Sequence, residues 1–289
     1  MIVAVASGKG GTGKTTIAIS LAISLADIMP PASLIFLDCD VEAPNAHLFL
    51  KPTFQEKQPV EILIPSVEEA RCVHCGTCAE VCQYHAIAVL GKKTLVFPQL
   101  CHGCGSCTLM CPEKAIHEVT NVIGVLERGP AIHGIRFGRG VMQIGEPMAG
   151  PVIRQLKRWM PPEPDQLVIL DAPPGTSCPV VVTVRRADFL LLVTEPTPFG
   201  LHDLRLAVDI ATELKIPAGV IINRDGERFE ALEDFCAVKG LPILMRIPFE
   251  RTIAEGLARG NTLVEIHPEY VKRFREVYRE IKELTLVKV

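Results

Sequence analysis

The sequence predicts an α/β fold in which a doubly wound, mostly parallel sheet is interrupted by a small α+β domain. Short apolar runs alternate with helix-length segments over most of the 289 residues, a pattern typical of parallel strands covered on both faces. A glycine-rich loop separates the first apolar run from the first helical segment. Eight of the eleven cysteines lie between Cys72 and Cys111, where apolar periodicity is scarce. We therefore expect one discontinuous domain at residues 1–65 and 118–289, with an inserted domain at residues 66–117.

Strands and helices are predicted to alternate on both sides of this insertion, joined by right-handed crossovers. The predicted strands are residues 2–6, 34–37, 119–126, 167–170, 189–193, 218–222 and 243–247. The predicted helices begin near Thr15, Pro151, Leu201, Phe229, Thr252 and Glu269. Residues 38–50 are expected to form a loop with a short helix. The glycine-rich residues 129–150 are expected to be irregular, with a hairpin.

Composition and charge narrow the cellular setting. The formal net charge of −3 indicates neither a general nucleic-acid partner nor an anionic membrane. No apolar run approaches the roughly 20 residues that a membrane helix needs, so we expect no membrane insertion. The start of the chain has no basic segment and no cleavage site, and we expect a cytoplasmic protein. In that compartment, clustered cysteines indicate metal or redox chemistry in preference to disulfides.

The first glycine loop has the spacing and the context of a phosphate-binding loop. It follows a predicted strand and opens a predicted helix, so its backbone N–H groups and the helix N-terminus can bind phosphate oxygens. Its residues are Gly8, Lys9, Gly10, Gly11, Thr12, Gly13, Lys14, Thr15 and Thr16. Lys14 is expected to reach the β- and γ-phosphates of ATP, and the Thr15 hydroxyl to bind Mg²⁺.

The lysine at position 9 adds specificity, because an ordinary phosphate loop does not require it. Lys-Gly-Gly-x-Gly-Lys-Thr-Thr resembles the deviant Walker motif of the MinD/ParA and nitrogenase iron-protein class. The resemblance implies an ATPase that binds ATP or ADP and forms a nucleotide-dependent dimer. It also implies that Lys9 reaches across the dimer to the partner's phosphates, and that Lys9, Lys14 and Asp40 are catalytic.

The same resemblance extends along both sides of the insertion. Asp38-Cys39-Asp40 follows a predicted strand and resembles the first switch of this class, in which Asp40 orients the attacking water and Asp38 supports the metal. Asp171, at the start of Asp-Ala-Pro-Pro-Gly, resembles the Walker B aspartate and begins the second switch. Asn223 matches the adenine-reading asparagine of the family, and Pro248 falls in a loop placed near the base. Each aspartate taken alone would more simply be a helix N-cap.

The clustered cysteines form two successive runs of the pattern C-x₂-C-x₂-C-x₃-C, the second followed by proline. This spacing is typical of bacterial ferredoxins with two [4Fe–4S] clusters, in which the fourth cysteine of each run binds the other cluster. The first ligand set is then Cys72, Cys75, Cys78 and Cys111. The second ligand set is Cys101, Cys104, Cys107 and Cys82. Zinc is the alternative that C-x₂-C pairs leave open. The first run departs from the pattern, because Gln83 stands where proline is usual.

The isolated cysteines and the histidines near the clusters are expected to have structural roles and to bind no cluster. Cys39 and Cys236 are expected to be buried as small hydrophobes. Cys178 matches a cluster-binding cysteine of the nitrogenase iron protein, but a second such cysteine is missing, so we expect no cluster there. The histidines near the clusters are expected to lie on turns or the surface: His74, His85 and His102. An apolar stripe over residues 270–284 predicts a C-terminal helix that packs on the core.

Three functions remain open from the sequence. The first is an ATPase with slow, partner-stimulated hydrolysis that couples ATP to electron transfer or partner binding through two [4Fe–4S] clusters. The second is an iron–sulfur cluster carrier or assembly ATPase. The third is a spatial organiser of the MinD/ParA type with structural or sensory clusters. The expected partners are a second copy or a related ATPase and a redox or iron–sulfur protein.

Overall fold

A computed structural model describes residues 1–226 and 228–286. Within this described part, nine strands form one sheet in the order β11-β10-β9-β1-β8-β2-β7-β6-β3. The parallel strands are β1 (Ile2–Ala6), β2 (Leu34–Asp38), β7 (Arg136–Met142), β8 (Leu167–Asp171), β9 (Phe189–Thr194), β10 (Ala218–Asp225) and β11 (Ile243–Pro248). Every residue of β2, β8 and β9 is buried, which explains why the central strands are apolar runs without alternation.

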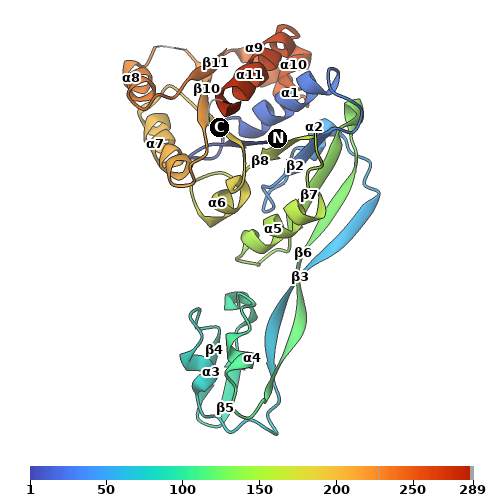
Figure 1. Cartoon of the computed structure of the whole chain (residues 1–289), viewed down its shortest axis with the longest axis vertical. Helices are drawn as coiled ribbons and strands as arrows, with labels where there is room; N and C mark the ends of the chain where they lie inside the picture. Colours follow the sequence, from blue (N-terminus) through green and yellow to red (C-terminus); the bar gives the residue numbers. More distant parts are fainter. Residues whose placement is uncertain (227, 287–289) are drawn as a thin grey trace.

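Helices cover both faces of this sheet (Figure 1). One hydrophobic cluster joins the sheet to α1 (Lys14–Ala26), α2 (His47–Leu50), α9 (Arg251–Ala258), α10 (Leu263–Ile266) and α11 (Glu269–Leu286). The other cluster joins the opposite face to α5 (Ala149–Trp159), α6 (Cys178–Val184), α7 (Pro198–Glu213) and α8 (Glu230–Val238). The apolar stripe of α11 is buried at Tyr270, Phe274, Val277 and Ile281, so the prediction of a core-facing helix is confirmed.

Two antiparallel strands complete the sheet and leave it. β6 (Ile116–Pro130) pairs with β7 over residues 124–130 and with β3 (Glu56–Val67) along the whole length of β3. Beyond Gly124 only this two-stranded ribbon continues, as the arm formed by residues 61–67 and 116–122. Figure 1 shows the arm projecting from the body, with the cysteine segment (residues 66–117) at its far end.

The prediction missed β3 and placed both ends of β6 too far inward. A two-stranded ribbon is exposed on both faces, so its sequence need not alternate apolar and polar residues. The residues of β3 are mostly exposed or half-buried. The glycine-rich stretch does contain a hairpin, as expected, between β6 and β7. The regular strand β7 within it was not predicted, because it contains Gly138 and Gly140. Larger side chains do not fit there, since Gly138 packs on Met160 at the end of α5 and Gly140 packs on Val152 of α5.

The cysteine segment has very little core of its own. It contains α3 (Thr77–Glu80), the hairpin β4 (Ile87–Leu90) and β5 (Lys93–Val96), a short 3₁₀ turn at Pro98–Leu100, and α4 (Ser106–Leu109). Its small hydrophobic cluster consists of Cys78, Ile87 and Ile116, with three valines and three more cysteines packed around them. The apolar packing available to this segment therefore depends largely on the cysteines themselves.

Candidate functional site

The glycine loop lies where the sequence places it, between the end of β1 and the start of α1. Gly13 caps the helix with a left-handed backbone (φ 93°), which glycine adopts without strain. A side chain at this position would also meet the amide of Asn223. Lys14 is only 7% exposed, and burial lowers the pKa of its ammonium against the opposing charges of Asp171 and Asp40. The Thr12 hydroxyl is buried without a hydrogen-bond partner in the described structure.

Two buried aspartates stand side by side under this loop. Asp38 ends β2 and Asp171 ends β8, and the two are direct partners in the parallel register. The Asp38 carboxylate accepts hydrogen bonds from the backbone N–H of Ala46 at 3.0 Å and of Asp40 at 3.3 Å. Burial and the neighbouring Asp171 raise the pKa of Asp38. The open edge of the sheet thus collects negative charge at adjacent strand ends, as α/β ligand sites do.

Asp171 is the less satisfied of the pair. Both of its carboxylate oxygens are buried, and neither has a hydrogen-bond partner within residues 1–226 and 228–286. Burial raises the pKa of Asp171 to about 7, although the nearby Thr15 hydroxyl and the Lys14 ammonium oppose the shift. Burial also raises the pKa of Asp40, against the attraction of Lys14. Orphaned carboxylate oxygens beside a threonine hydroxyl are the oxygen donors that Mg²⁺ prefers, so these residues fit the predicted ion.

Lys9 does not project freely from the loop. Its ammonium lies 3.1 Å from one carboxylate oxygen of Glu195, and the guanidinium of Arg224 lies 2.7 Å from the other. Neither Glu195 nor Arg224 was singled out in the sequence. Glu195 directly follows the buried strand β9, so the strand-end rule that drew attention to Asp38 and Asp171 also applies to it.

Asn223 and Pro248 lie at the same carboxyl edge of the sheet. The Asn223 amide donates a hydrogen bond to the carbonyl of Thr12 at 2.7 Å, which ties β10 to the glycine loop. Pro248 ends β11 and pairs with Asp225. The structure thus brings Asn223 against the loop and places Pro248 on β11, two strands beyond β9. Their predicted contact with adenine stays a prediction.

The eight clustered cysteines divide between two cavities in the cysteine segment. Four line one cavity with about 330 Å³ of unfilled space, part of it open to solvent: Cys72, Cys75, Cys78 and Cys111. Four line a second cavity with about 390 Å³ of such space: Cys82, Cys101, Cys104 and Cys107. These are the two interleaved sets expected from the spacing. In the described residues, no three His, Cys, Asp or Glu side chains converge on a single metal ion.

The two cysteine runs repeat the same local structure. Gly76 and Gly105 each cap a short helix with a left-handed backbone. The backbone N–H groups of Ala86 and Ala115 donate to the Cys82 and Cys111 sulfurs at 3.2 and 3.3 Å. Hydrogen bonds with the hydroxyls of Thr77 and Ser106 lower the pKa of Cys75 and Cys104, respectively. Thiolates in such positions are the ligands that iron–sulfur clusters use.

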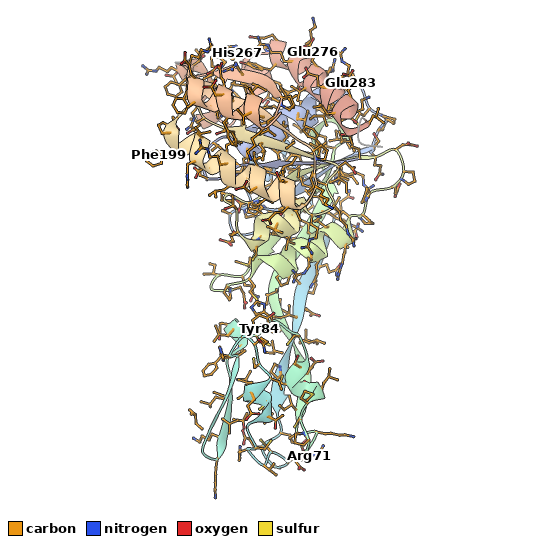
Figure 2. All side chains as sticks on the ribbon, turned by 60° about the vertical axis from the view of Figure 1, so that its left-hand side comes forward. Arg71, Tyr84, Phe199, His267, Glu276 and Glu283 are labelled. Carbon is orange, nitrogen blue, oxygen red and sulfur yellow. The ribbon has the colours of Figure 1, made fainter. Side chains whose placement is uncertain are left out.

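The cavities lie at different depths along the arm. Gly103, beside the second cavity, approaches the arm backbone at Leu63. Figure 2 shows Tyr84, which also lines this cavity, at the end of the segment nearest the body, and Arg71 at the far end. The ring of Tyr84 stacks on His102 at a centroid separation of 3.6 Å. Cys72, next to Arg71, lines the first cavity, which is therefore the more distant one.

The isolated cysteines behave largely as expected. Cys39 and Cys236 are buried, and burial raises the pKa of both thiols, that of Cys236 to about 11. Cys178 is exposed at the start of α6. His74 is not a free turn residue, because its ring lies 3.2 Å from the Thr94 hydroxyl and 3.6 Å from the Cys72 sulfur. Among the described helices, none has the length and apolar content required to cross a membrane.

Comparison with known proteins places this geometry in context. The model of the CobQ/CobB/MinD/ParA nucleotide binding domain matches residues 3–264. An uncharacterized protein of Methanocaldococcus jannaschii is 29% identical over 285 residues, which cover 98% of this chain and 97% of the relative. A protein of Aquifex aeolicus named iron-sulfur cluster carrier protein is 25% identical over 305 residues, with 100% of this chain and 69% of the relative covered.

Among solved structures, the septum site-determining protein MinD of Pyrococcus horikoshii in complex with Mg-ADP has the same fold. The TM-score is 0.59 at 19% identity, and the match covers 100% of this chain and 98% of that protein. The expected α/β, mostly parallel sheet with a phosphate loop is therefore confirmed at the level of the fold.

Because the buried oxygens of Asp171 lack hydrogen-bond partners in the described residues, we expect that removing the charge of this side chain stabilises the nucleotide-free protein. The folded-state pKa of Asp171, about 7, lies above the ordinary value of 3.8. Ionising Asp171 therefore costs the folded chain stability. This cost is absent below about pH 4, grows as the pH rises, and is complete above about pH 7. Asp171→Asn should raise the free energy of unfolding by roughly 1–4 kcal/mol at about pH 8, since one pKa unit is about 1.4 kcal/mol. Urea denaturation of the native chain and the variant, at about pH 4 and at about pH 8, measures this difference in the free energy of unfolding.

Asp209→Asn is the matched control, because Asp209 is exposed on α7. It should leave the stability unchanged to within about 0.5 kcal/mol. Addition of Mg²⁺ with ADP should stabilise the native chain more than the Asp171→Asn variant. If Asp171→Asn is less stable than the native chain at about pH 8 without nucleotide, the carboxylate is satisfied without a metal and our interpretation is wrong.

Proposed function

Since the chain belongs to the CobQ/CobB/MinD/ParA nucleotide-binding family, we propose that it is an Mg²⁺-dependent ATPase whose residues 66–117 hold two [4Fe–4S] clusters. In this proposal, ATP binding closes a dimer and alters how the clusters meet a redox or iron–sulfur partner protein. The observation that carries the proposal is the division of eight cysteines between two cavities in the interleaved sets of a two-cluster ferredoxin.

The nucleotide chemistry follows from the groups at the carboxyl edge of the sheet. The glycine loop and Lys14 bind the phosphates, while Thr15, Asp171 and Asp38 hold Mg²⁺ directly or through its water. Bound Mg²⁺ would neutralise charge on the phosphate oxygens. Asp40 orients the attacking water, a task that needs positioning more than strong basicity.

The cysteine segment fits the clusters through its donors. Each cavity has four thiols, and backbone N–H groups are already directed at Cys82, Cys101 and Cys111. Such N–H···S contacts stabilise charge on the sulfurs and tune a cluster's potential. Bound clusters would supply one-electron transfer. A separate zinc site needs four donors around one ion, and the eight thiols instead surround two larger cavities.

The first route from the nucleotide to the clusters passes through the first switch. Asp38 holds the N–H of Ala46, directly before α2. The Val41 carbonyl accepts from Met142 of β7 at 2.9 Å. A few residues later the chain becomes β3, with the N–H of Gln55 bonded to the Arg128 carbonyl at 2.9 Å. A shift of this switch on phosphate binding is thus passed to both strands that lead to the arm.

The second route passes through α5. The Lys157 ammonium lies within hydrogen-bond distance of three carbonyl oxygens near the end of α6, which follows the second switch: Val182 at 3.2 Å, Thr183 at 2.5 Å and Arg185 at 2.9 Å. Two residues earlier on α5, the Gln155 amide donates to the Glu61 carbonyl at the root of the arm at 2.9 Å. Switch segments ordered by phosphate and released on hydrolysis are a known two-state element.

A carrier of iron–sulfur clusters is the second candidate function. It is favoured by the Aquifex aeolicus relative that bears that name, and by the exposure of Cys75 and Cys104 at the rims of the two cavities. A carrier must give up its cluster to an acceptor, whereas an electron-transfer protein keeps it. Retention of iron therefore separates the two functions.

Metal content is the first expected outcome. Anaerobically isolated protein should contain about eight irons and eight labile sulfides per chain. Cys111→Ser should lose about half of both, because one cavity then lacks a ligand. Cys178→Ser is the matched control and should retain all of them. Iron and sulfide analysis with visible absorption spectra measures these quantities.

Two results would change this assignment. Stoichiometric zinc without broad visible absorption would replace the clusters with zinc sites. Loss of iron to an apo-ferredoxin acceptor within minutes would favour the carrier over the redox protein.

Hydrolysis tests the assignment of Asp40. Asp40→Ala should bind ATP within a few-fold of the native affinity but lose at least about 100-fold in turnover, because the water is no longer oriented. Lys14→Ala should instead weaken binding by about tenfold or more, since a charge on the phosphates is lost. The neighbouring exposed Glu42 provides the control, and Glu42→Ala should behave like the native chain. Single-turnover rates and nucleotide titrations measure both properties, and native turnover by Asp40→Ala would refute the role given to it.

Coupling is tested at α5. ATP should shift the cluster potentials, and linkage requires that cluster reduction shift the ATP affinity by the same free energy, ordinarily about 1–3 kcal/mol. For one electron, a tenfold change in affinity corresponds to about 59 mV. Lys157→Met should diminish the shift while iron content and ATP binding persist. The control is Lys239→Met, at an exposed position after α8. Redox titration with and without ATP measures the shift, and equal potentials under both conditions would make the cysteine segment a passive insert.

A further inference from the structure

The loop lysine that distinguishes this chain from ordinary phosphate-loop proteins is already engaged within its own chain. Glu195 is only 8% exposed, and its two carboxylate oxygens face two cations, Lys9 at 3.1 Å and Arg224 at 2.7 Å. The side chains of Lys9 and Arg224 are 34% and 52% exposed. One nearly buried anion is therefore shared by two cations that can reach solvent.

The backbone holds Glu195 in this position. Its carbonyl accepts from the N–H of Thr197 at 2.8 Å, and Thr197 caps α7 through its hydroxyl. Gly200 packs directly on the Glu195 backbone, so that no larger residue fits there. At the other end of the pair, Gly8 packs equally closely on Asp203 of the same helix. The first turns of α7 thus fix the glycine loop and Glu195 relative to each other.

Arg224 reaches the pair by a strained route. Its backbone is left-handed (φ 55°), a conformation that costs a residue with a side chain some free energy. Asn223, directly before it, is tied to the loop at Thr12. Two successive residues at the end of β10 are therefore directed at the glycine loop, one at its backbone and one at the carboxylate that holds Lys9.

We propose that Glu195 is a positioning residue that retains Lys9 in the single chain and releases it only when a second copy presents a γ-phosphate. The inference rests on the proposed function, in which Lys9 acts across a dimer. In this proposal the reach across the dimer draws the Lys9 ammonium away from Glu195, so that the two contacts alternate. On release Glu195 keeps Arg224, so that its nearly buried carboxylate is not left unpaired.

This competition makes the release of Lys9 depend on ATP. A γ-phosphate offers Lys9 more negative charge than one carboxylate, so exchange is favourable when ATP is bound. ADP lacks that group, and Lys9 then remains with Glu195. The pair lies at a face that a second copy can reach: Phe199, in the first turn of α7, is 77% exposed and projects into solvent at the edge of the body (Figure 2).

Dimerisation of the full chain with its iron bound tests the proposal. Glu195→Gln should tighten the dimer roughly three- to twentyfold, because two pairs break per dimer and each partly exposed pair contributes up to about fivefold. The gain should be larger with a non-hydrolysable ATP analogue than with ADP, because the native chain breaks the pair only when ATP is bound. In a Lys9→Gln background the same substitution should have no effect. Sedimentation velocity with Mg²⁺ and each nucleotide measures these constants.

Glu255→Gln serves as the matched control, since Glu255 pairs with Arg251 at 2.7 Å on the distant helix α9. It should leave dimerisation unchanged. Should Glu195→Gln fold poorly, Glu195→Asp keeps the charge and shortens the side chain, and it should give a smaller change in the same direction.

A second readout needs no dimer. Acylation of the Lys9 amine by an N-hydroxysuccinimide ester, followed by mass spectrometry, should be several-fold faster in Glu195→Gln without nucleotide. Unchanged acylation would overturn the proposal. Faster acylation with equal dimerisation would also overturn it, because the pair would then not compete with the partner's phosphate. If acylation rises but no variant dimerises with the ATP analogue, the proposed ATP-dependent dimer is itself wrong, and the release step falls with it.

Discussion

The organisation of this molecule depends on negative charge buried at the ends of two adjacent parallel strands. Asp38 and Asp171 are partners in the parallel register in the middle of the sheet, and both side chains have almost no solvent exposure. Water cannot compensate their charge, so their pKa values rise. The nearby ammonium of Lys14 and the N-terminus of α1 offset only part of this cost. A cation with bound phosphate would complete the site. Nucleotide binding would therefore strongly affect the conformation of the segments that carry these aspartates.

Those segments are the ones from which the arm and its supporting helix arise. The loop after Asp38 leads through α2 into β3, and the loop after Asp171 leads into α6, which is held by α5. The arm itself is a two-stranded ribbon with few buried side chains, so it has little independent means of fixing its direction. Its direction is set at its root, by β7, by α5 and by the loop that follows Asp38. In the proposed function, these contacts transmit a change at the phosphate site to the cysteines, although the cysteines lie far away in space (Figure 1).

The local patterns of the sequence predicted much of the body and most of the candidate site. Apolar runs located the central strands because these are buried on both faces. The glycine loop, the strand-end aspartates and the cysteine runs are local, so their spacing already indicates their chemistry. The strand Glu56–Val67 was missed because an exposed ribbon imposes no apolar pattern. The strand Arg136–Met142 was missed because its glycines, needed for close packing on α5, resemble those of a loop.

The sequence by itself determined the chemistry of short segments: a phosphate loop, strand-end carboxylates and two four-cysteine runs. Each of these features lies within a short stretch of the chain, so its spacing can be read directly. Only the tertiary structure decided how distant segments meet. It paired Glu195 with both Lys9 and Arg224, and it left the oxygens of Asp171 without partners among the described residues. It also set the cysteines at the end of an arm that is rooted beside the segments following Asp38 and Asp171. These contacts join residues far apart in sequence, and they depend on the strand order of the sheet, which the spacing within a single segment does not encode.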